Sequence, residues 1–136
     1  MHKPLNILLV EDDAIEVIKF NRVLRKMPSR HLIIEANNGQ HALDILGDRD
    51  VVPDIIVLDL NMPKLNGIEF LKKIKMDEYR KNIPIIIFTT SSHYVEINEC
   101  YRIGVAGYVL KPLKHIDYIS NTQSMIEYWS CNEFVN

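Results

Sequence analysis

The chain has 136 residues, a net charge of −2 at neutral pH, 47% hydrophobic residues and 25% charged residues. This length and composition predict one folded domain with a sizeable core and exclude a disordered chain. The slightly acidic balance lacks the basic excess that binds nucleic acid or an anionic membrane surface, and the longest apolar runs are too short to cross a bilayer.

Cysteine use and the N-terminal segment favour a cytoplasmic protein. Cys100 and Cys131 lie far apart in the sequence and form no CxxC pair, which favours reduced thiols. The first apolar run, residues 5–10, is followed by acidic residues instead of a small-residue cleavage site, so we expect no signal peptide.

Apolar patterns predict strands and helices that alternate along the chain. Several strand-like runs are nearly continuous in Ile, Leu, Val and Phe, which is typical of strands covered on both faces of a parallel sheet. The helices are predicted from apolar residues spaced at i, i+3, i+4 and i+7, a stripe that includes Cys100 and Tyr101 in the fourth helix. In chain order we predict strand 5–10, helix 20–27, strand 31–36, helix 42–46, strand 54–59, helix 67–74, strand 84–90, helix 97–104, strand 107–111 and a last helix over about 114–129.

This alternation predicts an α/β fold. Strand and helix follow each other five times, which favours an open, doubly wound parallel sheet with right-handed crossovers and helices on both faces. No repeat, linker or low-complexity tract interrupts the pattern. We therefore expect a single domain over residues 1–136, with a core of about 5–129 and a short tail over 130–136.

Polar residues gather where the predicted strands end. Ligands of open α/β sheets bind outside the carboxyl ends of the strands, so these residues are candidates for a site. If the first and third strands are neighbours, their carboxylates share one crevice with a lysine and a hydroxyl on its other side. The residues in question are Glu11, Asp12 and Asp13 after the first strand, Asp59 and Asn61 after the third, Thr89 at the fourth and Lys111 at the fifth.

A cluster of carboxylates at this edge indicates a divalent cation. Like charges in close contact push one another toward protonation, and a hard dication such as Mg²⁺, which prefers oxygen ligands, relieves this. With the cation and Lys111 nearby, Asp59 can attack phosphorus and form an aspartyl phosphate.

Each of these residues also has an ordinary structural explanation. Glu11 and Asp12 could lie in a solvated loop that opens a helix, and Asp13 fits a helix cap better than a ligand. Lys111 alone could be a surface lysine, and Thr89 alone an ordinary strand-end hydroxyl. The joint occurrence of suitable residue types at four strand ends favours the functional interpretation.

The chain resembles the receiver domain of bacterial two-component response regulators. The matching stretches are "ILLVEDD", "IIVLDLNMPKLNG", "PIIIFTTSS" and "GYVLKP", in this order, and the resemblance covers about residues 5–129. It implies a flavodoxin-like (βα)5 sheet with strand order 2-1-3-4-5. It also implies a signalling switch phosphorylated by a sensor histidine kinase, which is an enzyme at most toward its own phosphotransfer and autodephosphorylation.

The resemblance assigns the central roles residue by residue. Asp59 corresponds to the phosphoacceptor. Glu11, Asp12, Asp59 and the backbone carbonyl of Asn61 correspond to the ligands of Mg²⁺ or Mn²⁺. Lys111 corresponds to the lysine that pairs with the acceptor and then with its phosphoryl group.

Further positions correspond to the switch and its surroundings. Thr89 matches the hydroxyl that turns toward the phosphoryl group, and Tyr108 matches the aromatic residue that moves inward when Thr89 moves. Gly67 matches the turn that shapes the loop after the acceptor strand. The Lys111–Pro112 peptide bond is expected to be cis.

The C-terminal helix raises the question of partners. Its segment "YISNTQSMIEYW" carries a single charge, Glu127, so its outer side is either merely polar or a partner surface with Trp129 and Phe134 as anchors. We expect a downstream protein or phosphotransfer partner, or a homodimer, on the face of the fourth helix, fifth strand and fifth helix. The segment "SMIEYW" is also similar to stand-alone regulators associated with bacterial phytochrome-type kinases.

Other protein classes fit the sequence less well. An aspartate-dependent phosphohydrolase of the haloacid dehalogenase type needs a DxD pair, and Asn61 stands where its second Asp belongs. A flavodoxin-like FMN binder needs a Ser/Thr/Gly-rich loop after the first strand, where this chain has "EDDA". A DNA-binding regulator needs an output domain with a basic recognition helix, so we expect protein contacts and no nucleic acid or membrane partner.

Overall fold

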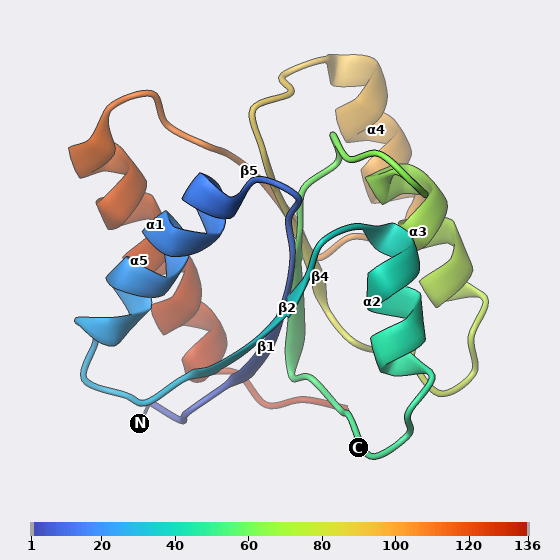
Figure 1. The fold of residues 1–136 in the computed structure, drawn as a ribbon, viewed down its shortest axis with the longest axis horizontal. Helices are drawn as coiled ribbons and strands as arrows, with labels where there is room; N and C mark the ends of the chain where they lie inside the picture. The colour runs from blue at the N-terminus through green and yellow to red at the C-terminus, as the bar shows by residue number, and fades with distance from the viewer. Residues whose placement is uncertain (1, 136) are drawn as a thin grey trace.

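The computed structural model describes residues 2–135, which form a parallel sheet between two layers of helices (Figure 1). The strands are β1 (Asn6–Val10), β2 (Leu32–Ala36), β3 (Ile55–Leu58), β4 (Ile85–Thr89) and β5 (Gly107–Leu110). The helices are α1 (Ala14–Arg25), α2 (Gly39–Leu46), α3 (Gly67–Lys75), α4 (Tyr94–Ile103) and α5 (His115–Ser130). All strand pairs are parallel and the order is β2-β1-β3-β4-β5, which confirms the predicted fold class.

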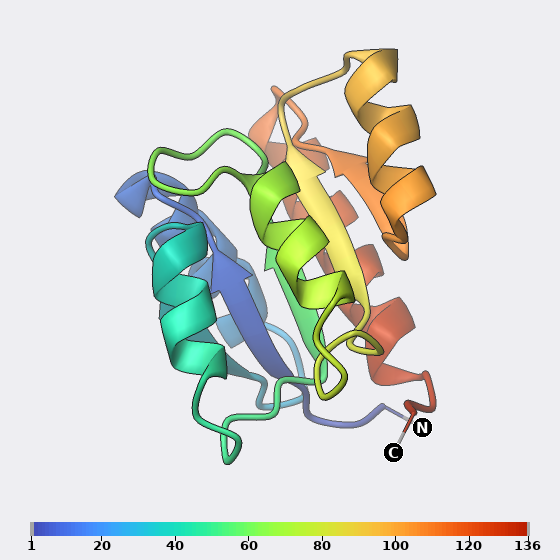
Figure 2. The ribbon, with the colours of Figure 1, turned by 90° about the vertical axis from the view of Figure 1, so that its right-hand side faces the viewer.

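The two faces of the sheet bury separate apolar clusters. Successive residues of a strand point to opposite faces, so Ile7 and Leu9 pack toward α1 and α5 while Leu8 and Val10 pack toward α2 and α3. Figure 2 shows α2, α3 and α4 in front of the sheet, and α1 and α5 cover its other face. This double coverage explains why the central strand β3 is apolar and buried at every position.

Helix α4 is less buried than its sequence pattern predicts. Cys100 is its only buried residue, and Tyr101, which the pattern assigns to the apolar stripe, is 51% exposed. The helix lies at the rim of its layer, where it packs beside α3 and presents only a narrow face to the core (Figure 2). An ion pair between Lys72 and Glu99, with 3.5 Å between nitrogen and oxygen, connects α3 and α4 at the surface.

The C-terminal tail folds back onto the end of α5 and the N-terminal segment. The ring of Phe134 stacks on that of Trp129 at 6.4 Å, and both are partly buried against the core. Lys3 donates a backbone hydrogen bond to Ser130 O at 2.9 Å and pairs through its ammonium with Glu133 at 2.8 Å. The two rings therefore pack against each other within the chain and remain partly exposed, so their interpretation as anchors of a partner surface stays a prediction.

No helix among the described residues is long and apolar enough to span a membrane.

Candidate functional site

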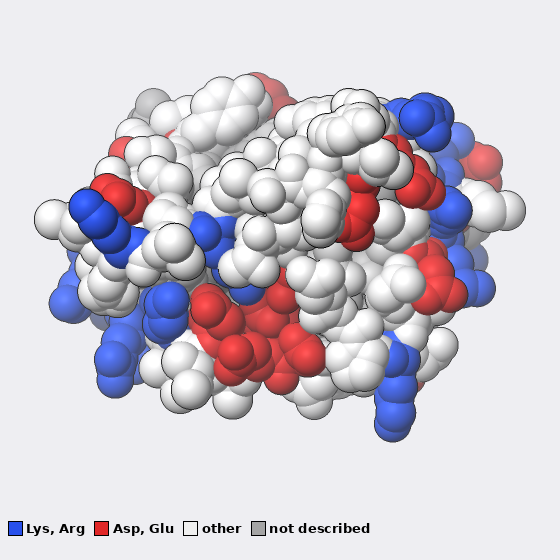
Figure 3. Space-filling view, turned by 90° about the horizontal axis from the view of Figure 1, so that it is seen from above, with Lys and Arg blue, Asp and Glu red and all other residues white. Residues whose placement is uncertain are grey.

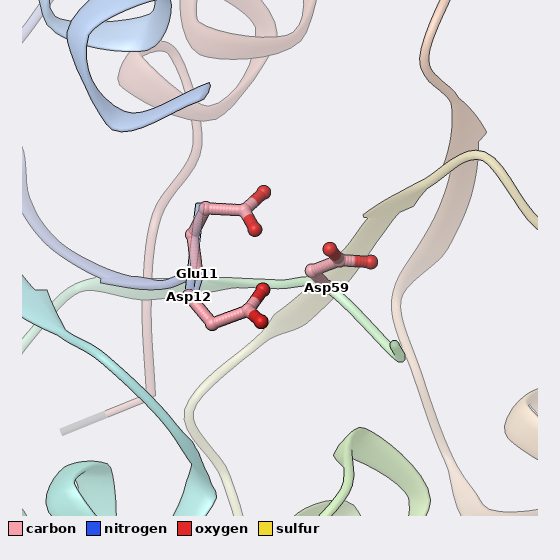
Figure 4. A group of neighbouring side chains, drawn as sticks. All are labelled: Glu11, Asp12 and Asp59. Atoms are coloured by element: carbon pink, nitrogen blue, oxygen red, sulfur yellow. The ribbon is translucent and has the colours of Figure 1, made fainter. Parts of the chain in front are cut away.

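Three carboxylates converge at the carboxyl ends of β1 and β3. Glu11 and Asp12 follow β1 directly and Asp59 follows β3, and the adjacent ends of these strands are tied by a 3.1 Å hydrogen bond from Asp59 N to Val10 O. Each of the three side chains offers an oxygen that lies within 4.8 Å of the others (Figure 4). The structure thus brings together three of the predicted metal ligands.

The cluster lies in the middle of the surface formed by the strand ends. In Figure 3 acidic side chains gather there, with Lys and Arg on either side. Glu11 and Asp59 are buried, whereas Asp12 is exposed. Burial raises the pKa of Glu11 to about 7, with the charge of Asp59 adding to the effect and Lys111 opposing it.

Lys111 reaches this cluster from the end of β5. Its ammonium donates a hydrogen bond to Glu11 and lies 3.6 Å from Asp59 Oδ2, beyond hydrogen-bond length. Burial acts to lower the pKa of Lys111, but the hydrogen bond to Glu11 and the charge of Asp59 outweigh it and raise the pKa. The lysine is therefore charged, and its direct partner here is Glu11 instead of the predicted acceptor.

Glu16 is a fourth carboxylate at the site, and it is not among the residues predicted from the sequence. It lies in the first turn of α1, and its Oε2 atom is 3.8 Å from the Lys111 ammonium. The signal for it was present, because Glu16 precedes the buried Phe20 by four residues and so falls on the apolar face of the helix. Asp13, in contrast, caps α1 by accepting a 2.9 Å hydrogen bond from Ile15 N, which confirms its interpretation as a cap.

The side chains of Thr89 and Tyr108 are both hydrogen-bonded to the backbone of Ser91, in the loop that follows β4. Thr89 is fully buried, and its hydroxyl accepts a long hydrogen bond of 3.5 Å from Ser91 N. The Tyr108 hydroxyl donates a 2.7 Å hydrogen bond to Ser91 O, and its ring is half-buried against the core. The backbone of Lys111 is bonded to Thr89 O at 2.8 Å, so the three residues form one connected unit.

The loop after Asp59 has an unusual backbone. Asn61 is exposed and its N–H donates a 3.3 Å hydrogen bond to Asp59 Oδ1. Lys64 and Leu65 then adopt φ angles of +48° and +64°, a left-handed conformation that is uncommon outside glycine.

Gly67 is required where this loop enters α3. A Cβ atom at this position would lie 2.7 Å from the Cα of Leu60 and 2.8 Å from the carbonyl oxygen of Asp59. The turn after β3 is therefore packed against the backbone at the end of that strand.

At the other side of the site, the Lys111–Pro112 bond is trans, as are all peptide bonds in the described part of the chain, which corrects the expected cis bond. The trans form of an X–Pro bond is favoured by about 0.5–1 kcal/mol.

The donor set at the strand ends fits a divalent cation. Carboxylate oxygens are hard ligands, and Glu11, Asp12 and Asp59 supply them without nitrogen or sulfur. Among the described residues, the buried carboxylates of Glu11 and Asp59 have one hydrogen-bonded ammonium, that of Lys111, which leaves negative charge to be balanced.

The fold and the site together define a doubly wound α/β domain with an acidic cluster, suited to a divalent cation, at the carboxyl ends of its central strands. Residues 7–123 match the family model of the response regulator receiver domain, and the chain belongs to this family. The resemblance noted in the sequence is thereby confirmed.

Known relatives and solved structures agree with this assignment. The probable methanogenesis regulatory protein FilR2 of Methanothrix harundinacea is 32% identical over 93% of this chain and 84% of its own length. The nitrate/nitrite response regulator NarL of Escherichia coli is 31% identical over 86% of this chain, which spans only 52% of NarL.

Two similar structures are the phosphorylated cyanobacterial phytochrome response regulator RcpA and the Mn²⁺-bound response regulator Rcp1. RcpA has a TM-score of 0.92 and 27% identity, and Rcp1 has a TM-score of 0.90 and 29% identity. Both comparisons cover 98% of this chain and 99% of the other. The predicted similarity to stand-alone phytochrome-associated regulators is confirmed.

Proposed function

We propose that this chain is a phosphoacceptor response regulator in which Asp59 receives a phosphoryl group from a sensor histidine kinase. The observation that carries the proposal is the Lys111 ammonium 3.6 Å from Asp59 Oδ2, beside the clustered carboxylates of Glu11 and Asp12. A carboxylate held between a fixed cation and a metal site is suited to attack phosphorus. The chain acts as a switch, and its chemistry is limited to its own phosphotransfer and dephosphorylation.

The transfer exchanges one bond to phosphorus for another. A carboxylate oxygen of Asp59 forms a P–O bond while the P–N bond of a phosphohistidine breaks, and the leaving imidazole takes up a proton from water. Hydrolysis later replaces the bond to Asp59 by a bond to a water oxygen and restores the carboxylate. Lys111 offsets the added charge, since a phosphoryl group brings about −1.5 to −2.

Mg²⁺, or Mn²⁺ in its place, is the proposed cofactor. Glu11, Asp12 and Asp59 would hold it, with the backbone carbonyl of Asn61 as a further ligand. When bound, the cation neutralises charge on the phosphoryl oxygens. The Mn²⁺-bound structure of Rcp1 supports this choice.

Thr89 and Tyr108 form the proposed switch. The Thr89 hydroxyl turns toward the phosphoryl oxygens, and the Tyr108 ring takes the space that it leaves. Since both residues are hydrogen-bonded to Ser91, their movement acts on the loop that leads into α4. The low burial of α4 supports the proposal, because a helix with a single buried residue is displaced with little loss of packing.

The proposed output surface is the face of α4, β5 and α5. Tyr94 and Val95 of α4 and Ile116 of α5 expose more than half of their area there. We propose a downstream protein, a phosphotransfer partner or a second copy of this chain as its occupant. Sedimentation measures the oligomeric state of the wild type and of Ile116→Asp, with and without phosphodonor. If the occupant is a second copy of this chain, the wild type self-associates and the variant does not.

The proposed phosphodonor is a histidine kinase of phytochrome type in the cytoplasm. The likeness to the phytochrome response regulator RcpA supports the kinase class. The free thiols of Cys100 and Cys131 support the reducing compartment.

Intact-mass measurement tests the acceptor. The wild type, Asp59→Asn and Asp13→Asn are incubated with Mg²⁺ and acetyl phosphate or phosphoramidate. Asp13→Asn is the matched control, because it removes an acid beside the cluster while asparagine keeps the helix cap. We expect one phosphoryl group on the wild type and on Asp13→Asn, none on Asp59→Asn, and none on any protein in EDTA.

The alternative outcomes are equally informative. If Asp59→Asn gains a phosphoryl group as readily as the wild type, Asp59 is not the acceptor. If the folded wild type gains none from either donor, either Asp59 accepts only from the kinase or the chain is a receiver without phosphotransfer. Hydrolysis of a generic phosphoester with turnover would instead favour a phosphohydrolase.

A further inference from the structure

Glu16 is a charged residue on the buried face of α1. Its side chain is 23% exposed, and its Oε2 atom is buried without a hydrogen bond from any described residue. The helix dipole favours an acid in the first turn of a helix, but this preference does not require the acid to be buried. Burying an unpaired carboxylate oxygen is unfavourable, so its position needs a further cause.

Two cations flank this carboxylate at distances just beyond a hydrogen bond. The Lys111 ammonium lies 3.8 Å from Oε2, and the Lys19 ammonium lies 3.6 Å from Oε1. Lys19 is itself held in place, because its ammonium lies 4.3 Å from the ring centre of Tyr118 in α5. Glu16 is thus oriented from one side by Lys19 and faces Lys111 on the other.

Lys111 and the proposed cation share the same carboxylate, Glu11, and Glu16 is close enough to serve as an alternative partner of the lysine. Its hydrogen-bonded partner is Glu11, which is also a proposed ligand of the divalent cation. A cation bound to Glu11 would compete with the Lys111 ammonium for the charge of the same carboxylate, so metal binding is expected to weaken the pairing of Lys111 with Glu11. Glu16 is the carboxylate near Lys111 that does not belong to the metal cluster.

We propose that Glu16 is a positioning residue that takes over the Lys111 ammonium when Glu11 ligates the divalent cation. This inference rests on the metal site of the proposed function. A shift of about 1 Å closes the present 3.8 Å gap to the length of a charge-assisted hydrogen bond. The unpaired Oε2 atom gains a partner, and Lys111 is retained beside Asp59, ready for the phosphoryl group.

The test is a double-mutant cycle on the affinity for Mg²⁺ alone. Calorimetric titration with Mg²⁺ is carried out on the wild type, Glu16→Gln, Lys111→Met and the double variant, without any phosphodonor. Thermal unfolding of each protein shows that it is folded before titration. Glu35→Gln, which removes an exposed acid that has no ion pair with Lys111, measures the effect of a lost charge.

We expect Glu16→Gln to raise the Mg²⁺ dissociation constant about 3- to 10-fold when Lys111 is present, and less than about 2-fold in the Lys111→Met background. A residue that acts only through its general field would weaken Mg²⁺ by the same factor in both backgrounds. Equal factors, or no change with Lys111 present, would overturn the proposal.

Failure of this inference is distinguishable from failure of the proposed function. If the wild type binds no Mg²⁺, the proposed metal site is wrong and the inference falls with it. If the wild type binds Mg²⁺ and the two substitutions act independently, the site stands and only the role of Glu16 is wrong.

Discussion

Raising the pH toward 7 should destabilise the metal-free protein, because burial raises the pKa of Glu11 in the folded chain. Burial raises the pKa of Glu11 from 4.5 to about 7, with Lys111 opposing the change. Between these values the folded state holds a proton that the unfolded state has released, so the free energy of unfolding falls as the pH rises. At about 1.36 kcal/mol per pH unit, this interval corresponds to at most about 3 kcal/mol.

Urea denaturation followed by circular dichroism measures this loss. The wild type and Glu11→Gln are compared in EDTA between about pH 5 and about pH 8, and the glutamine cannot ionise. His31 acts in the opposite direction, because burial and then His2 lower its pKa, so the folded state binds that proton less readily. The His31 contribution is common to both proteins and cancels in their difference, which isolates Glu11.

Divalent cation binding should depend on the same proton. Glu11 must be deprotonated to ligate Mg²⁺, so below its pKa of about 7 the affinity rises with pH and above it levels off. The dissociation constant is expected to fall by up to about tenfold per pH unit in the lower range. An unfolding difference between wild type and Glu11→Gln that is constant with pH, together with a pH-independent Mg²⁺ affinity, would refute the reasoning.

Three further substitutions test the loops around the site and the sheet. Arg80→Met removes a buried guanidinium that donates two hydrogen bonds, of 3.0 and 2.9 Å, to carbonyls at the end of α2, and urea denaturation should show a loss of about 1–3 kcal/mol. Gly67→Val places a Cβ atom 2.7 Å from Leu60 Cα, so we expect a lower melting temperature and slower phosphorylation by acetyl phosphate. Tyr108→Phe removes the 2.7 Å bond to Ser91 O, which should cost about 0.5–1.5 kcal/mol and speed amide exchange in residues 90–93.

Each of these substitutions has a matched control in the chain. Lys81→Met removes an exposed cation, Gly107→Val adds a side chain where the nearest contact is an ordinary 3.9 Å, and Tyr128→Phe removes an exposed hydroxyl. If a control has the same effect as its partner, the specific contact is not the cause. Unchanged exchange at residues 90–93 in Tyr108→Phe would show that this hydroxyl does not hold the loop.

The sheet could be predicted because burial on both faces leaves a strong mark in the sequence. Neighbouring residues such as Leu8 and Leu9 are both apolar because each is buried in a cluster on its own side of the sheet. Helix α4 was harder to predict, because Tyr101 has the correct spacing but lies at the rim of the layer. Spacing shows which face of a helix can be apolar, whereas the neighbours decide how much of that face is covered.

The loop after Asp59 shows a second limit. Left-handed backbone is usually predicted from Gly or Asn, and neither residue stands at Lys64 or Leu65. Their conformation follows from the surroundings, since Gly67 brings the start of α3 onto the backbone of Leu60 and leaves the connecting residues little freedom. Such tertiary constraints are absent from a local sequence pattern.

The partner of Lys111 could not be predicted from the sequence, because it depends on the geometry of the site. The rule that ligands bind at the carboxyl ends of parallel strands places Lys111, Glu11 and Asp59 at one edge, although the lysine is 100 residues from its partner Glu11. That rule does not say which carboxylate the lysine contacts. The structure shows Glu11 hydrogen-bonded to Lys111, Asp59 at 3.6 Å and Glu16 at 3.8 Å, so three acceptors compete for one ammonium over a small range of distance. Because the proposed cation would be held by Glu11 and Asp59 and not by Glu16, its binding would weaken the first two interactions and leave the third, so we expect the position of Lys111 to depend on whether metal is bound.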